Sequence, residues 1–339
     1  MRKGWEYKRL DECANIEYGT RVVQKKDSGT LYPVYGGGGE TFRMDKFNRE
    51  DCLIVARFAM SRRCVRFVNG KFFLNDSGLS VKAGDKLYQS YLNYNIISLN
   101  DDIYHLGKGA AQRNLDVKSF KKLTIAIPPQ STQLAIVSEL DKINELIRLK
   151  KEQLKDFDNL AQSLFYEMFG DPVENEKGWE VKKLIEVSSL INGRAYKQNE
   201  LLSEGKYKVL RVGNFFTNSN FYYSNLELED EKYCYKGDLL FAWSASFGAF
   251  IWDEDKTIFH YHIWRVLFDK AILDIHYYQY LLNTMTSFFM NDVHGIGMVH
   301  LTKSGMEQYE LPLPPLSLQR LFAQRIEQIE REKSEVQKS

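Results

Sequence analysis

Apolar side chains recur at helical spacing through the middle of the chain. From Ser131 to Phe169 there is no proline and no glycine, and Gly170-Asp171-Pro172 follows. Alternate steps of four and three residues along this stretch reach almost only apolar positions, a period typical of a coiled-coil seam. The seam residues are Ile136, Leu140, Ile143, Ile147, Leu154, Phe157, Leu164 and Met168. We expect one uninterrupted helix of about 60 Å, because each residue adds about 1.5 Å.

A second helix is predicted at the end of the chain, from about Leu316 to Ser339. Its apolar residues Phe322, Ile326 and Ile329 stand 186 positions after counterparts in the first seam. Each stripe by itself is explained by core packing, but two helices in one register favour mutual antiparallel pairing. The second helix has a length of only about 36 Å. We therefore expect the first seam to lack its partner from about Leu154 to Met168.

The chain repeats itself at the ends of two long segments. Gly4-Trp5-Glu6 returns as Gly178-Trp179-Glu180, and Pro128-Pro129-x-Ser131-x-Gln133 returns as Pro314-Pro315-x-Ser317-x-Gln319. The two serines are predicted helix N-caps. Between these shared ends the sequences differ almost completely, which suggests one scaffold with two specificities. The predicted division is 1–129, a spacer helix over 130–170, 171–315, and a C-terminal helix over 316–339.

The segments between the shared ends indicate a mixed α/β (α+β) fold. Short runs rich in Val, Ile, Phe and Tyr predict strands, and two other stretches predict helices. The predicted strands are Cys52–Ala56, Val65–Val68, Leu239–Trp243 and Ile263–Phe268, and the predicted helices lie near Lys86–Leu92 and His276–Phe289.

Composition favours an ordinary soluble protein. The hydrophobic fraction is 44% and the charged fraction 27%, while the four cysteines form no close pair. Such cysteines fit a reducing cytoplasm better than disulfides or zinc. We find no signal peptide and no membrane-spanning run, and we expect a cytoplasmic location.

Charge is distributed unevenly along the chain. The net charge of the whole chain is +1. Residues 1–129 carry +8 and residues 171–315 carry −6, when Lys and Arg are counted against Asp and Glu. The first segment therefore has the charge of a polyanion binder, and the third does not.

The ordered set of motifs closely resembles the specificity subunit of type I restriction–modification systems. The resemblance rests on the two Gly-Trp-Glu openings, the two Pro-Pro-x-Ser-x-Gln junctions and the helix end Met168-Phe169-Gly170-Asp171-Pro172. Tyr32–Gly37 with Asp51–Arg57 resembles one style of target recognition domain, and Leu210–Asn214 with Lys236–Phe241 resembles another. The resemblance covers the whole chain, and no single motif would carry it.

The resemblance implies a subunit that makes and breaks no bonds. Two target recognition domains, related by the internal repeat, would each read half of a split site in double-stranded DNA. Long helices forming an antiparallel coiled coil would set the gap and dock methyltransferase subunits, which bring S-adenosylmethionine. A restriction–translocase subunit, with ATP and Mg²⁺, would join through the methyltransferase. The short second helix adds the possibility of self-association through the unpaired part of the spacer.

Patterns that resemble catalytic or metal sites have simpler explanations. The Pro-Pro pairs lack the amide or carboxylate with which DNA amino-methyltransferases hold a base, and there is no phosphate-binding loop. Glu180-x-Lys182 resembles a nuclease motif but belongs to the repeated scaffold, as Glu6-x-Lys8 does. His260 and His262 have no third ligand nearby, so we interpret them as a packed or DNA-facing pair. We expect no catalytic and no metal-binding residue.

DNA-reading residues are sought among cations, amides and hydroxyls, because these bind phosphates and base edges. In the first domain four arginines fall within ten residues, and a second cluster lies near the domain end. The candidates are Arg21, Lys25, Lys26, Arg57, Arg62, Arg63, Arg66, Lys108, Gln112, Arg113 and Asn114. Arg21, Lys25 and Lys26 are expected to contact phosphates. A solvated strand edge is the alternative for the arginine cluster.

The second domain offers fewer cations. Arg194 is assigned to the place of Arg21 in the repeat, and Trp243 is either a DNA contact or part of the core. The candidates are Arg194, Tyr196, Lys197, Gln198, Arg211, Asn214, Trp243, Ser244, Ser246, His300 and Lys303. The charge of this half predicts weak DNA binding on its own, with methyltransferase partners supplying much of the contact.

Four other functions were weighed against this one. The chain could serve a related type II system in which methylation and cleavage share one partner polypeptide, or be a shortened or phase-variant subunit that works as a dimer. It could also be a nuclease acting alone, or a protein scaffold that binds no DNA.

Overall fold

The protein is described by a computed structural model over residues 4–109, 112–217, 219–292 and 301–338. The chain folds into two compact units, Met1–Arg148 and Leu149–Ser339. We call these the first and the second unit. Among the described residues, no helix is long and apolar enough to cross a membrane.

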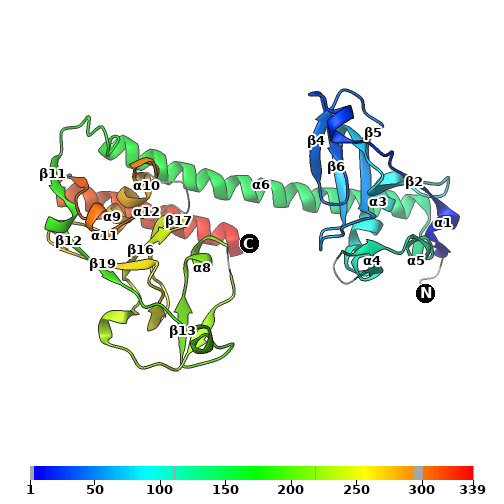
Figure 1. Cartoon of the computed structure of the whole chain (residues 1–339). Helices are drawn as coiled ribbons and strands as arrows, with labels where there is room; N and C mark the ends of the chain where they lie inside the picture. The colour runs from blue at the N-terminus through cyan, green and yellow to red at the C-terminus, as the bar shows by residue number, and fades with distance from the viewer. Residues whose placement is uncertain (1–3, 110–111, 218, 293–300, 339) are drawn as a thin grey trace. The chain divides into compact units, whose positions relative to one another are not determined.

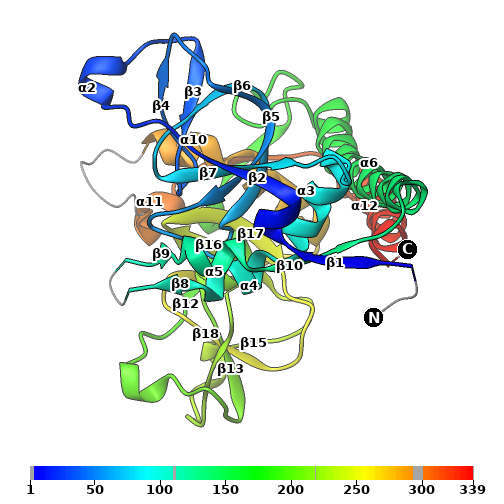
Figure 2. The same cartoon turned by 90° about the vertical axis from the view of Figure 1, so that its right-hand side faces the viewer.

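The first unit is a mixed α/β domain built around a six-stranded sheet (Figure 2). Its elements are β1 (Glu6–Arg9), α1 (Leu10–Cys13), β2 (Ala14–Tyr18), α2 (Gln24–Asp27), β3 (Tyr32–Tyr35), β4 (Glu40–Met44), β5 (Arg49–Ala56), β6 (Val65–Leu74), β7 (Gly78–Ala83), α3 (Gln89–Ser98), α4 (Asn100–His105), β8 (Gly107–Lys108), β9 (Asn114–Leu115), α5 (Val117–Lys121) and β10 (Thr124–Ile127). The sheet order is β2-β7-β5-β6-β3-β4, and β1 pairs with β10 in a separate antiparallel ribbon.

The second unit holds two four-stranded sheets, ordered β12-β19-β16-β17 and β14-β13-β18-β15, and a ribbon of β11 with β20. Its elements before the final helix are β11 (Glu180–Lys183), α7 (Leu184–Val187), β12 (Ser188–Asn192), a 3₁₀ turn (Gln198–Glu200), β13 (Tyr207–Leu210), α8 (Val212–Phe216), β14 (Tyr222–Ser224), a 3₁₀ turn (Asp230–Lys232), β15 (Tyr233–Cys234), β16 (Leu239–Ser244), β17 (Ser246–Ile251), β18 (Thr257–Phe259), β19 (Ile263–Phe268), α9 (Ile275–Thr284), α10 (Thr286–Asp292), α11 (Lys303–Met306) and β20 (Glu310–Leu313).

The two units share one strand arrangement. In the first, β3 runs parallel to the end of β6, with Val34 opposite Phe73. In the second, β13 runs parallel to β18, with Val209 opposite Ile258. β18 occupies the place that the end of β6 takes in the first unit. The single strand β6 therefore corresponds to two strands, β17 and β18, in the second unit. The predicted internal repeat is therefore present in three dimensions, and so are all four predicted strands.

The predicted spacer is a single helix, α6 (Gln130–Phe169), drawn in green in Figure 1. It ends where the sequence indicates, because Gly170 has a φ of 76° and its N–H donates to the Tyr166 carbonyl at 2.8 Å. Only glycine adopts this left-handed conformation without strain. The final helix, α12 (Leu316–Lys338), begins directly after the second Pro-Pro pair.

The predicted N-caps are wrong. Both helices begin before Ser131 and Ser317, so these serines lie in the first helical turn. The preceding proline takes the capping place, since the Pro129 carbonyl already accepts the N–H groups of Thr132 and Gln133 at 2.9 and 3.0 Å.

Two buried glutamines hold the repeated junctions instead. Gln133 is fully buried, donates to the carbonyls of Lys86 and Pro128, both at 2.9 Å, and accepts from the Tyr88 N–H at 2.9 Å. Gln319 is also fully buried and makes the same three bonds in the second unit, to Ile272, Pro314 and Asp274. Each amide therefore fastens the start of a long helix to its own unit.

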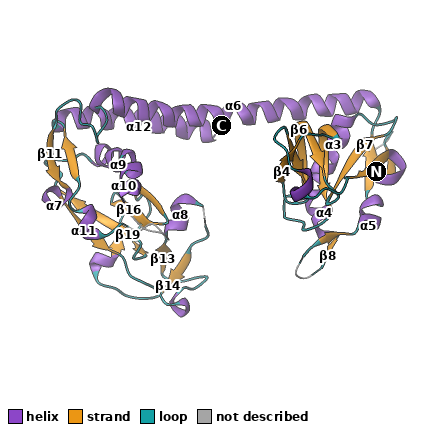
Figure 3. Ribbon diagram, turned by 45° about the horizontal axis from the view of Figure 1, so that its top comes forward, coloured by secondary structure: helices purple, strands orange, loops and turns teal. Residues whose placement is uncertain are grey.

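The antiparallel pairing of α6 with α12 is confirmed, but it involves the opposite part of α6 from the one expected (Figure 3). Phe322 packs on Phe165 and Phe169 with ring centroids 5.7 and 5.3 Å apart, while Lys333 pairs with Asp158 farther back along α6. The reason is local: β11 and β20 pair, and they join the end of α6 to the start of α12.

The unpaired part of the seam lies between residues 141 and 149, all of which are exposed. Ile143 is 51% exposed and Ile147 46%, whereas Phe322 and Ile326 are at most 1% exposed. Ile136 and Leu140 are half-buried against the first unit, and Leu154, Phe157, Leu164 and Met168 are half-buried in the second.

Candidate nucleic-acid interface

Two predicted clusters of the first unit meet at the end of β5. The Leu115 N–H donates to the Arg57 carbonyl at 2.8 Å, and the Met60 N–H donates to the Arg113 carbonyl at 2.9 Å. The Asn114 side-chain oxygen accepts the Ala59 N–H at 3.3 Å. The arginine-rich loop, Arg57–Arg66, and the segment Gln112–Asn114 therefore form one surface, although they lie far apart in the sequence. We call it the arginine surface.

Rings and backbone carbonyls hold the arginines of this surface. The guanidinium groups of Arg62 and Arg113 lie 5.4 and 4.7 Å from the centroid of the Tyr104 ring. Arg66 donates to the carbonyls of Gly37 and Arg63, each at 3.0 Å. Guanidinium groups restrained in this way lose less side-chain entropy when they bind a phosphate or a base.

The remaining candidates of the first unit are exposed. Lys108 pairs with Asp116 at 2.6 Å, and this contact holds the pKa of the Asp116 carboxyl at about 2. Gln112 and Arg63 are exposed beside the arginine surface. Arg21 and the two lysines of α2, Lys25 and Lys26, are exposed on a different segment.

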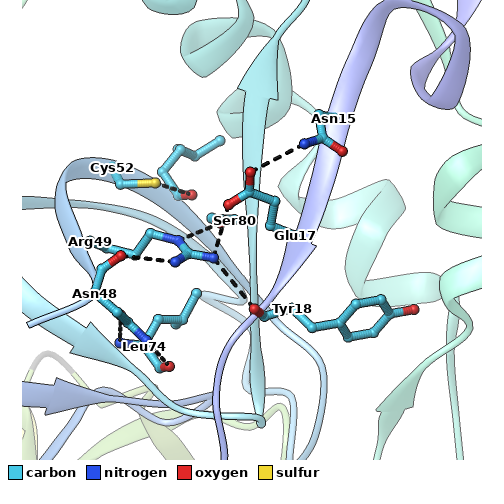
Figure 4. Close-up of polar contacts among 9 residues, drawn as sticks. Asn15, Glu17, Tyr18, Asn48, Arg49, Cys52, Leu74 and Ser80 are labelled. Atoms are coloured by element: carbon cyan, nitrogen blue, oxygen red, sulfur yellow. Dashed lines mark hydrogen bonds and ion pairs between the residues drawn. The ribbon is translucent and has the colours of Figure 1, made fainter.

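Arg49 differs from the candidate arginines, because its side chain is bound within the sheet of the first unit (Figure 4). Its side chain is only 19% exposed. It donates to the Ser80 hydroxyl at 2.9 Å and to the Tyr18 carbonyl at 3.4 Å, and lies 3.0 Å from a Glu17 oxygen. Because these partners belong to β7 and β2, Arg49 fastens three strands together.

Arg194 is also engaged within the protein. Its guanidinium makes a two-point contact with the Glu200 carboxylate at 2.8 and 2.9 Å and lies over the Tyr196 ring. Arg194 holds the pKa of Glu200 at about 2. Lys197 and Gln198 follow on the exposed turn.

The predicted alignment of Arg194 with Arg21 is wrong by one residue. The Arg194 N–H donates to Phe259 at 3.0 Å, as the Thr20 N–H donates to Leu74 at 2.9 Å. Arg194 therefore takes the place of Thr20. Sequence alignment missed this because only the preceding glycine is shared.

A cleft of about 1050 Å³ lies beside these residues in the second unit. Arg211, Asn214, His260 and His262 are among its lining residues. The Asn214 side chain is occupied locally, since it accepts the Arg211 N–H at 2.8 Å and donates to the Ser219 carbonyl at 2.7 Å. Arg211 is exposed and is left as the cation of this cleft.

A smaller cleft of about 400 Å³ shares His262 with the larger one as a lining residue. Trp243, Tyr261, His262 and Lys303 line it. Trp243 is half-buried and stacks on Trp264, with ring centroids 5.3 Å apart. Of the other candidates, Ser244 is buried, Ser246 is half-buried, and His300 lies outside the described residues.

The turn His260-Tyr261-His262 lines both clefts, whereas the sequence indicated only that its two histidines form a packed or DNA-facing pair. The rings of Tyr261 and His262 are 3.8 Å apart, and Tyr261 is exposed. Burial, His262 and Arg211 lower the pKa of His260 to about 4, so this imidazole is neutral at pH 7. The only sequence signal was the alternation of two histidines, which is equally typical of packed residues.

The arginine surface of the first unit and the two clefts of the second unit present hydrogen-bond donors held in place and aromatic faces. Such groups suit base edges and phosphates. Within the described ranges, no cluster of three or more His, Cys, Asp or Glu residues could hold a metal ion.

The chain is similar in sequence to type I restriction enzyme specificity subunits. The chain is 26% identical over 272 residues to a putative type I restriction enzyme specificity subunit of Haemophilus influenzae, covering 75% of this chain and 69% of the relative. It is 22% identical over 315 residues to the MjaVIII specificity subunit of Methanocaldococcus jannaschii, covering 80% and 73%.

A crystal structure of a type I S subunit from M. genitalium has the same fold. The TM-score is 0.58 at 16% sequence identity, with 98% of this chain and 93% of that chain covered. The family model for the type I restriction modification DNA specificity domain matches residues 2–156 and again residues 176–339. The chain therefore belongs to the family of type I restriction–modification specificity subunits and carries two copies of its DNA specificity domain.

Proposed function

We propose that this chain is the subunit that selects the DNA sequence in a type I restriction–modification system. Each unit reads one half of a split site in double-stranded DNA. The observation that carries the proposal is the double family match, to residues 2–156 and again to residues 176–339. The two copies share a strand arrangement, in which β3 with β6 corresponds to β13 with β18. Two domains with different surfaces are suited to a site with two different halves.

The arginine surface of the first unit supports this function. A net charge of +8 over residues 1–129 favours association with the phosphate backbone. Restrained guanidinium groups at Arg62, Arg66 and Arg113 offer the geometry that binds phosphate oxygens or guanine. The second unit supplies fewer cations and more aromatic rings. Its contribution to the affinity for DNA therefore rests on contacts of these rings more than on charge.

The proposed partners and cofactors are those that the family resemblance implies. The chain is non-catalytic in this proposal and acts through methyltransferase subunits, which carry S-adenosylmethionine. A restriction–translocase subunit, which uses ATP and Mg²⁺, joins through the methyltransferase. Helices α6 and α12 set the distance between the half-sites and dock these subunits.

Self-association is part of the same proposal, at a different place from the one first expected. The exposed large aliphatic residues of α6 are Leu134, Ile143, Leu146, Ile147, Leu149 and Leu160. Four of the six fall within residues 143–149, whereas Phe157, Leu164 and Met168 pack against the core cluster that contains Phe322 and Ile326 of α12. A second copy or a partner helix would therefore be bound at residues 143–149.

The experiment that tests the function is to map methylated positions in cells that express the chain with its cognate methyltransferase. We expect methylation at one split sequence, and protection of both halves when the purified complex is footprinted. One altered base pair in either half should weaken binding by about 1–3 kcal/mol. Methylation without the chain, or footprints without a split site, would contradict the proposal and leave a scaffold role.

A further inference from the structure

The same turn occurs in both units, with different side chains. In Asn75–Gly78, the Asn75 N–H donates to the Tyr35 carbonyl at 2.9 Å, and the last N–H of the turn donates back to the Asn75 carbonyl at 3.1 Å. In His260–Ile263, the His260 N–H donates to the Leu210 carbonyl at 2.9 Å, and the last N–H donates back to the His260 carbonyl at 3.0 Å. We call these the first and the second recognition turn.

A glycine fixes each turn in the same position. A Cβ on Gly19 would lie 1.9 Å from the Asn75 carbonyl oxygen, and one on Gly193 would lie 2.4 Å from the His260 carbonyl oxygen. Real Cβ atoms do not approach so closely, so both glycines are required by the backbone of the turn. The turns thus belong to the shared frame of the two units.

The neighbouring strand meets the turn in the same way in both units. The Arg57 N–H donates to the Ser77 carbonyl at 2.8 Å, and the Trp243 N–H donates to the His262 carbonyl at 3.1 Å. Two residues later, Ala59 has a φ of 48° and Ala245 a φ of 64°. Arg57 and Trp243 therefore occupy equivalent positions, although nothing in their chemistry suggests it.

Their side chains are anchored to equivalent atoms. A guanidinium N–H of Arg57 donates to the Asp76 carbonyl at 3.1 Å, and the indole N–H of Trp243 donates to the Tyr261 carbonyl at 3.0 Å. Asp76 and Tyr261 are the second residues of the two recognition turns. Each anchor holds a large side chain against its turn. The Arg57 guanidinium also lies 5.1 and 4.3 Å from the centroids of the Tyr18 and Phe58 rings. The Trp243 indole stacks on Trp264 and lines the smaller cleft of the second unit.

What differs between the units is the chemistry at this place. The first unit presents the Arg57 guanidinium beside the turn residues Asp76 and Ser77, so it offers several hydrogen-bond donors and acceptors. The second presents the Trp243 indole beside Tyr261 and His262, with ring centroids 6.1 and 5.2 Å from the indole. A variable surface on an invariant frame is what a domain needs if it is to read a different sequence.

We propose that Arg57 with the first recognition turn, and Trp243 with the second, are the specificity-determining elements of the two units. The proposal rests on the function proposed above. Arg57 reads a base edge in the first half-site by hydrogen bonds, for which guanine is the best partner of an arginine fork. Trp243, Tyr261 and His262 read the second half-site mainly by apolar and ring contact, which favours a thymine methyl group.

The test selects preferred sequences from a randomised duplex library with the chain bound to its cognate methyltransferase. In Arg57→Gln, preference at one base pair of the first half-site should fall roughly 5-fold to 150-fold, with the second half-site unchanged. In the triple variant Trp243→Arg, Tyr261→Asp, His262→Ser, which transfers the first unit's residues, the second half-site alone should change. Thermal unfolding midpoints establish that each variant is folded.

Matched controls remove an exposed cation elsewhere, in Lys46→Gln for the first unit and Arg325→Gln for the second, and should leave both preferences intact. If the triple variant does not fold, Arg57→Lys decides, because lysine keeps the charge and loses the fork. Wild-type selection of a split site with unchanged preference in the variants would overturn this inference alone. Failure of the wild-type complex to select any site would overturn the proposed function instead.

Discussion

At the residue scale, the shared frame depends on a few buried polar groups. Gln133 and Gln319 stand 186 positions apart and make the same three hydrogen bonds in their own units. A buried amide that satisfies three backbone groups cannot be replaced by an apolar residue without leaving them unpaired. In the Pro-Pro-x-Ser-x-Gln motif, the glutamine therefore has the structural role, whereas the serine does not act as the helix N-cap.

Replacing either glutamine should destabilise its own unit. In Gln319→Leu, the carbonyls of Ile272 and Pro314 and the Asp274 N–H lose their partners, and we expect a loss of at least about 3 kcal/mol in the free energy of unfolding. Denaturant titration followed by circular dichroism measures it. The control Ser317→Ala should cost less than about 0.5 kcal/mol, whereas a true N-cap would cost about 1 kcal/mol.

The neutral imidazole of His260 predicts a pH dependence. Its pKa is about 4 in the folded chain and ordinarily 6.5, so below pH 6.5 the unfolded chain binds a proton that the folded chain excludes. Stability should therefore fall as the pH is lowered from 6.5 towards 4. The variant His260→Asn, which introduces the residue of the first turn, should show a smaller decrease in thermal midpoint between pH 6.5 and 4.5.

The Arg194–Glu200 contact affects both chains equally, because its stabilisation is lost as the pH falls from the ordinary carboxyl pKa of 4.5 towards about 2. An identical pH profile for His260→Asn and the unaltered chain would contradict the prediction.

At the element scale, the two ends of α6 have different surroundings. Its last turns are covered by α12 and α9, and Phe165 is fully buried among Phe169, Tyr277 and Phe322. Residues 141–149 have no such cover. One continuous seam in the sequence thus corresponds to two packed segments and an exposed stretch between them.

Two alanine substitutions on the same seam helix should therefore differ sharply. Phe165→Ala removes a buried ring and should cost about 3–5 kcal/mol of unfolding free energy. Ile143→Ala, at a 51% exposed position, should change it by less than about 0.5 kcal/mol. Thermal unfolding at low protein concentration measures both. An equal loss in the two variants would mean that residue 143 is covered in solution, as self-association would require.

The sequence predicted these elements unevenly. The two long helices and the repeated domains could be predicted because the 3.5-residue period and the Pro-Pro junctions are local patterns that recur. The covered part of α6 was predicted wrongly because helix length alone does not show which end α12 meets; the β11–β20 pairing decides it, and pairing of strands so distant leaves no local pattern. The recognition turns were missed because backbone carbonyls anchor them, and these impose no residue type.

At the scale of the whole molecule, one backbone frame occurs twice with different charge. Residues 1–129 carry +8 and residues 171–315 carry −6, so the first unit is expected to supply most of the salt-dependent affinity. The equivalence of Arg57 and Trp243 in the repeat extends this difference to the surface that reads bases. The frame could be recognised from its shared motifs, whereas equivalence of such dissimilar residues required the structure.

The measurement that tests the central claim most directly is the gap between half-sites when α6 is lengthened. Four helix-forming residues inserted after Arg148, in the exposed stretch, add about 6 Å, or roughly two base pairs at about 3.4 Å each. Methylated positions are then mapped in cells that express the variant with its methyltransferase. We predict that both half-site sequences stay the same and that the gap grows by one or two base pairs; an unchanged gap would contradict the account.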